Sequence, residues 1–174
     1  LFLLTRGGRD SVARVISKDG RWDVTPGFDL DSGFNAQAAA RDNQGRVWVT
    51  GINSNSVLVL APSLDQRLGT VDLSALVEPS SEDGFAELGS IVPCTNSDSI
   101  LVLASRLRRT RKGWIPDAQG GVATLSSSRA ALVSTELVAA PNLAAGRCSR
   151  GLGAQAVFDR SLIGSGDLSQ THPN

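Results

Sequence analysis

The sequence has no methionine or tyrosine, one histidine (His172), and only 5% aromatic residues. Its 17 basic and 17 acidic side chains cancel, so no net charge attracts nucleic acid or an anionic membrane surface. The longest apolar runs span about six residues, whereas a membrane-crossing helix needs roughly twenty. We therefore predict neither nucleic-acid binding nor membrane insertion, and we expect no histidine-based catalysis within residues 1–163.

Glycines and short aliphatic runs are abundant instead. The chain contains 18 glycines, and hydrophobic residues make up 41% of it. Valine- and leucine-rich runs separated by Gly, Asn and Asp are typical of antiparallel strands joined by tight turns. We predict an all-β fold over 1–163, followed by a flexible tail over 164–174.

A repeated pattern subdivides the chain. Three segments, GFNAQAAARD at Gly33, GFAELGSIVP at Gly84 and GLGAQAVFDR at Gly151, align without gaps. The interval from Gly84 to Gly151 exceeds the interval from Gly33 to Gly84 by the length of segment 106–121. We interpret this segment as an insertion between the second and third strands of a blade. Because a four-stranded blade of a β-propeller takes about 40–50 residues, the pattern predicts blades over 33–77 and 84–140.

Three strands at the start of the chain and one near its end add up to one further blade. Residues 1–24 carry the pattern from its second strand onward, with LFLLTR placed over RVWVTG and DSVARVIS over NSVLVLAP, and 151–160 begins another blade. The small residues of 36–40 suit a first strand lining a central channel, although an alanine run also favours a helix. About three blades are too few to close a propeller. We therefore expect a fragment of a longer protein or a six-bladed pair of copies.

Residues 43–50 and 55–60 carry a nameable resemblance. NQGRVWVT followed by NSVLVL resembles the bacterial propeller repeats of the YVTN and NHL type, with a glycine turn, an aromatic, an asparagine turn and an aliphatic strand. The resemblance covers 33–73 well and 1–159 loosely. It implies a fold rather than an activity, since such families include scaffolds, surface proteins, lyases and lactonases. It also implies an exported bacterial protein that is secreted, periplasmic or at the cell surface.

Five of the 17 basic side chains lie in one segment, which is the best candidate for a contact loop. The candidate binding residues are Arg106, Arg108, Arg109, Arg111, Lys112 and Trp114. An acidic partner surface or a polyanion would fit them, whereas the plain alternative is a solvated loop. The other tryptophans, Trp22 and Trp48, are expected to pack between blades.

The remaining polar groups predict little chemistry. Glu78, Glu82, Asp83 and Glu87 form a small acidic group that we interpret as a solvated connection. Cys94 and Cys148 are a disulfide candidate, with two free thiols as the alternative. No catalytic residue, metal or cofactor is predicted. The sequence favours a non-enzymatic scaffold or protein-binding module; the alternatives are a propeller hydrolase or lyase with a site at the central channel, and a carbohydrate- or polyanion-binding module.

Overall fold

The computed structural model describes residues 2–5, 9–94, 97–116 and 119–138. These residues form thirteen strands and one short 3-10 helix, η1 (Ser74–Leu76), with no α-helix among them. Every strand pairing is antiparallel. The predicted all-β class is therefore confirmed. In this part of the chain, no helix has the length and apolar character needed to cross a membrane.

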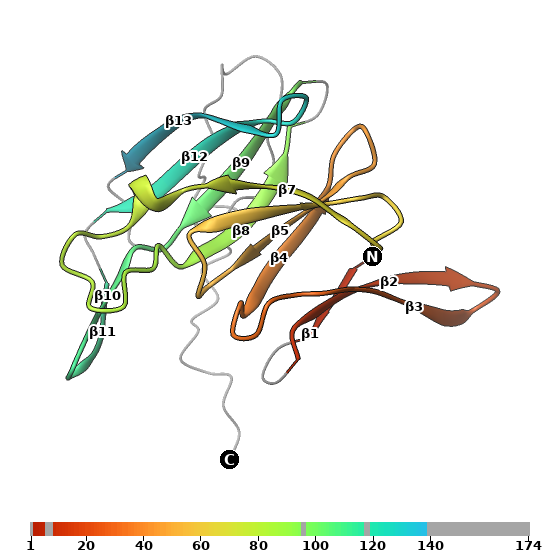
Figure 1. Cartoon of the computed structure of the whole chain (residues 1–174), viewed down its shortest axis with the longest axis horizontal. Helices are drawn as coiled ribbons and strands as arrows, with labels where there is room; N and C mark the ends of the chain where they lie inside the picture. The colour runs from red at the N-terminus through yellow and green to blue at the C-terminus, as the bar shows by residue number, and fades with distance from the viewer. Residues whose placement is uncertain (1, 6–8, 95–96, 117–118, 139–174) are drawn as a thin grey trace.

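The strands form three larger sheets and one hairpin (Figure 1). The first sheet holds β1 (Phe2–Thr5), β2 (Ser11–Lys18) and β3 (Arg21–Asp29). The middle sheet holds β4 (Ala36–Arg41), β5 (Val47–Gly51), β6 (Ser56–Leu60) and β7 (Arg67–Asp72). The third sheet holds β8 (Leu88–Pro93), β9 (Ser99–Ala104), β12 (Gly120–Ser126) and β13 (Ala131–Val138). The hairpin pairs β10 (Leu107–Thr110) with β11 (Gly113–Pro116).

The inner strands of the middle sheet, β5 and β6, are buried on both faces, and Figure 1 shows this sheet between the other two. Along β5, Trp48 belongs to the apolar cluster shared with the third sheet, whereas Val47 and Val49 belong to the cluster shared with the first sheet. Strand β6 alternates in the same way, with Val57 and Val59 toward the third sheet and the two leucines toward the first. Side chains of a strand alternate between its two faces, so a continuous apolar run is the sequence signature of a sheet covered on both sides.

The same set of hydrogen bonds links each sheet to the next. In the first sheet, the Asp10 carbonyl accepts from Leu30 N (2.8 Å), and its carboxylate Oδ2 accepts from Asn35 N (2.5 Å). In the middle sheet, the Asn55 carbonyl accepts from Leu73 N (2.7 Å), and its amide Oδ1 accepts from Ala86 N (2.9 Å). Each of these two polar residues precedes the third strand of a blade pattern. We call the pair the inter-sheet clamps.

Two sequence predictions about strands agree with the structure. The hairpin β10–β11 falls between β9 and β12, where the insertion over 106–121 was expected. The alanine run forms strand β4, so the helical alternative for these residues is wrong.

Two of the predicted alignments, in contrast, are wrong by one residue. Ala36 and Leu88 occupy equivalent places, because each pairs with the last residue of the second strand of its sheet, Gly51 or Ala104. Leu88 nevertheless lies one residue farther from Gly84 than Ala36 lies from Gly33. For the first sheet, the clamps make Asp10 equivalent to Asn55, and therefore Ala13 equivalent to Leu58. Leu3 pairs with Ala13 and Val49 pairs with Leu58, so Leu3 is the residue equivalent to Val49. The ungapped alignment had placed the following residue there.

The prediction for Trp22 is also wrong. Trp48 is fully buried between sheets, as expected, but Trp22 is 65% exposed. It lies on β3, and it pairs with Ser17 on the face of the first sheet turned away from the middle sheet. The stack of described sheets ends at that face. The predicted strand 151–160 and the tail 164–174 lie outside the described residues.

Candidate functional site

The inserted hairpin β10–β11 presents two basic residues at its tip. Its two-residue turn, Arg111 and Lys112, joins Thr110 to Gly113, and both turn residues are exposed. The Thr110 hydroxyl donates to the Gly113 carbonyl (3.0 Å) and accepts from Lys112 N (3.2 Å). Gly113 has φ +121°, in a region that L side chains rarely adopt. The turn is therefore held by local hydrogen bonds and by a glycine, and the basic side chains face solvent.

The base of the hairpin is anchored by Arg106, which corrects its predicted role. This side chain is buried, and its Nε donates to the Leu76 carbonyl of η1 (3.1 Å). A buried guanidinium cannot contribute to an exposed contact surface. The cluster of basic residues read from the sequence thus divides into an anchor, Arg106, and a tip, Arg111 with Lys112.

The remaining candidates of the cluster lie within the two strands of the hairpin. Arg108 and Arg109 are in β10 and Trp114 is in β11, where Arg109 and Trp114 face each other in the register. Their side chains are outside what the structure describes. Their contribution to binding stays a prediction.

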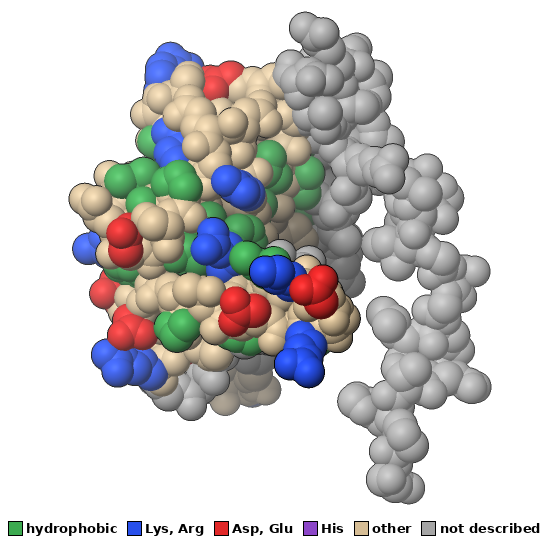
Figure 2. Space-filling view, turned by 90° about the vertical axis from the view of Figure 1, so that its right-hand side faces the viewer, with side chains coloured by type: hydrophobic (Ala, Val, Ile, Leu, Met, Phe, Trp, Pro, Cys, Tyr) green, Lys and Arg blue, Asp and Glu red, His purple; other side chains and the backbone are tan. Residues whose placement is uncertain are grey.

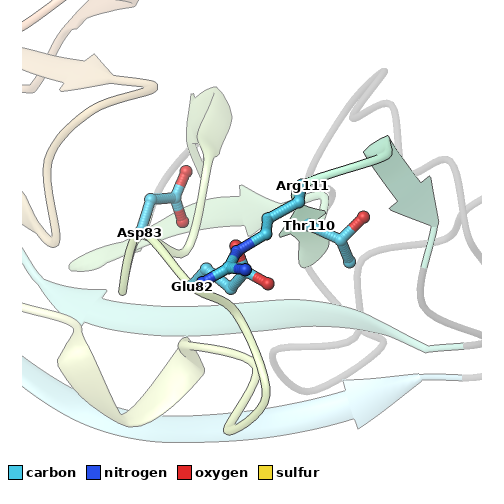
Figure 3. Close-up of a pocket in the computed structure, with 4 residues that line it drawn as sticks. All are labelled: Glu82, Asp83, Thr110 and Arg111. Carbon is cyan, nitrogen blue, oxygen red and sulfur yellow. The ribbon is translucent and has the colours of Figure 1, made fainter.

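A cleft of about 400 Å³ lies beside the tip. Thr110 and Arg111 line it from the hairpin, and Glu82 and Asp83 line it from the connection between the middle and third sheets. Figure 3 shows the Arg111 side chain extending toward Glu82, with Asp83 on the other side of the same connection. The structure thus brings the predicted basic segment together with part of the predicted acidic group.

The rest of the acidic group is not in the cleft. The Glu78 carboxylate Oε2 accepts from the Ser80 amide (2.9 Å) and hydroxyl (2.6 Å) and so closes a turn. Glu87 is buried at 4% exposure, which corrects the interpretation of the whole group as a solvated connection. Only Glu82 and Asp83 are positioned to meet a ligand at the hairpin tip.

A second polar cluster, which the sequence did not reveal, lies at the β12–β13 turn. The hydroxyls of Ser126 (2.5 Å), Ser127 (2.7 Å) and Ser128 (2.8 Å) donate to the Asp98 carboxylate, as does the Ser128 amide (2.6 Å). These bonds, with that of Ser126 first, hold the pKa of Asp98 well below its ordinary value, because they favour the charged form. The serine run was visible in the sequence, but its acceptor comes from a loop almost thirty residues earlier.

This cluster is joined to the middle sheet through Arg46. The guanidinium forms an ion pair with Asp42 (2.8 Å) and also donates to the Ser127 carbonyl. The Asp42 carboxylate additionally accepts from the buried Trp48 indole (2.8 Å). Every carboxylate oxygen in this network has structural donors. The network ties the middle and third sheets together.

Within the described ranges, no three or more His, Cys, Asp or Glu side chains come together in a way that could hold a metal ion. Cys94 is buried and disulfide-bonded. Cys148, the other cysteine of the sequence, lies outside the described residues, so the proposed pair stays a prediction.

No family model and no curated protein matches the chain.

Proposed function

We propose that the three sheets are blades of a β-propeller, and that the chain is a non-enzymatic partner-binding module of an exported bacterial protein. Support for the arrangement comes from the middle sheet, which is covered on both faces and linked to its neighbours by equivalent clamps. Adjacent blades of a propeller bury each other in this way. The YVTN- and NHL-like repeat pattern of the sequence supports the same arrangement.

The contact element in this proposal is the tip of the β10–β11 hairpin. The hairpin extends from the third sheet in Figure 1, and it is anchored at its base by buried Arg106 while Arg111 and Lys112 are exposed. Binding residues are commonly carried by loops and insertions on a rigid scaffold. The exposed tip on an anchored base is the observation that carries the proposal.

The charges around the tip favour a protein partner over a polyanion. Glu82 and Asp83 line the same cleft as Arg111, so an incoming phosphate or sulfate would meet two carboxylates beside the cation. A protein surface can present charges of both signs and so match such a cleft. On the face shown in Figure 2, basic and acidic side chains are also interspersed.

Site-specific photo-crosslinking in the bacterium that makes the protein tests this proposal. We expect a photoreactive amino acid at position Lys112 to give one discrete adduct, because the tip contacts a partner. The matched control is the same amino acid at Lys18, which is exposed beside the turn of another hairpin, β2–β3. No adduct at Lys112, or the same adducts at both positions, would contradict the proposal.

A second measurement distinguishes a protein partner from a polyanion as the ligand of the hairpin tip. A heparin column run at about 0.15 M salt, where the Debye length is about 8 Å, should not retain the protein. Retention that is abolished by the double variant R111E/K112E, and not by K18E/R21E, would favour the polyanion-binding module instead.

A further inference from the structure

The cleft beside the hairpin tip has two walls, and hydrogen bonds hold each of them in place. On the acidic wall, Asp83 Oδ1 accepts from the Ser81 hydroxyl (2.7 Å) and from the Phe85 amide (3.3 Å). The same wall is tied to the middle sheet, because Asn55 Nδ2 donates to the Gly84 carbonyl (2.8 Å). The opposite wall is the β10–β11 turn, whose base is anchored to η1. A ligand that enters the cleft therefore has little of the protein to order, which lowers the cost of binding.

Two opposite charges face this cleft without an ion-pair partner. Glu82 and Arg111 are both exposed, and they line the cleft from its two walls. Within the ranges that the structure describes, neither side chain takes part in an ion pair, and the three ion pairs found there lie elsewhere. Asp83 differs from them, because its carboxylate already accepts two bonds from its own turn. The cleft thus offers a partner one free carboxylate and one free guanidinium.

We propose that the partner of the hairpin tip presents a basic and an acidic group side by side, the basic group to Glu82 and the acidic group to Arg111. Complementary charges across an interface fix how two proteins dock, and a partner with the reverse order would place like charges together. The pair of charges therefore selects both the kind of partner surface and the direction in which it docks. The inference rests on the proposed function, since it requires that the tip contact a protein.

The size and charge of the cleft favour the basic group as the one that enters it. The volume of about 400 Å³ is large enough for the end of a lysine or arginine side chain. Two carboxylates and one guanidinium line the cleft, so its net charge is negative and attracts a cation. The acidic group of the partner then remains at the tip, where Arg111 and Lys112 are exposed.

Charge reversal combined with photo-crosslinking at position Lys112 tests this inference. E82K and R111E should each lower the yield of the adduct by at least about tenfold, because each brings like charges together. The control D23K reverses an exposed carboxylate on β3, in the first sheet, and should leave the yield unchanged. All three changes are at exposed positions, so the melting temperatures should match that of the unmodified protein.

The exchanged variant E82R/R111E separates contact with a partner from a pair within the chain. The inference predicts a yield no higher than that of either single variant, since both groups of the partner then meet like charges. If Glu82 and Arg111 served only to pair with each other, the exchange would restore the adduct, and the inference would be overturned. A yield that E82K leaves unchanged would also overturn it, although the proposed function would stand. If position Lys112 gave no adduct even without these changes, the proposed function would be wrong and the inference with it.

Discussion

The middle sheet and the first sheet share a repeat pattern and a clamp but differ in what covers them. The middle sheet has neighbours on both faces, and Trp48 on β5 is fully buried. The first sheet has a described neighbour on one face only, and Trp22 on β3 is 65% exposed. A tryptophan in a strand therefore does not report burial by itself. Its burial depends on whether another sheet is present on that side.

The largest expected effect comes from comparing these two tryptophans. Trp48→Ala should lower the free energy of unfolding by about 3–5 kcal/mol, because it leaves a large cavity between two sheets. Trp22→Ala should change it by less than about 0.5 kcal/mol in a monomeric sample, since little packing is lost. Urea denaturation measures both. Equal losses would contradict the difference between the sheets.

A smaller effect is expected at the clamps, which the two sheets share. Asp10→Ala removes the acceptor of the Asn35 amide and should cost about 1–3 kcal/mol of unfolding free energy. Asp10→Asn should recover most of that loss, because Asn55 performs the same role in the middle sheet. If Asn proved as damaging as Ala at position 10, the two clamps would not be equivalent.

A pH-dependent effect is expected at the Asp98 cluster, which the first sheet lacks. The pKa of Asp98 is lowered in the folded state, so the ionised carboxylate favours folding above the unfolded pKa of about 3.9. That contribution is lost as the pH falls from about 4 toward the folded pKa. Asp98 is exposed, so water screens part of this contribution. Asp98→Asn should therefore lower the melting temperature by only about 2–4 °C at pH 7, and the gap to the unmodified protein should narrow below pH 4.

The control for this prediction is Asp23→Asn, on the exposed strand β3. This variant should stay within about 0.5 kcal/mol of the unmodified protein at pH 7. A gap for Asp98→Asn that is constant from pH 7 to pH 3 would show that the serine bonds do not depend on its charge.

The sequence predicted the strands and the hairpin because their signals are local. Glycines at positions 33 and 84, which have φ +80° and +68°, mark the entry to each full sheet, and the apolar runs mark strands covered on both faces. The register was missed by one residue. The difference between β4 and β8 arises in the turns that enter them, because the turn from Gly84 to Leu88 is one residue longer than the turn from Gly33 to Ala36, whereas both strands contain a similar bulge.

The site was predicted less well, because its properties depend on contacts between distant residues. The burial of Arg106 depends on Leu76, thirty positions away, and the cleft depends on the approach of Glu82 and Asp83 to the hairpin tip. A cluster of basic residues in a sequence does not show which residue anchors the segment and which residues face solvent. The exposed tip could be predicted only as part of a larger segment.

The central claim is that the three sheets repeat about one common axis, as propeller blades do. Residual dipolar couplings of backbone amides measure this most directly, because they give the orientation of each sheet in a common frame. The account predicts that the rotation from the first sheet to the middle sheet equals the rotation from the middle to the third, about parallel axes. Two rotations that differ in size or axis direction would contradict it.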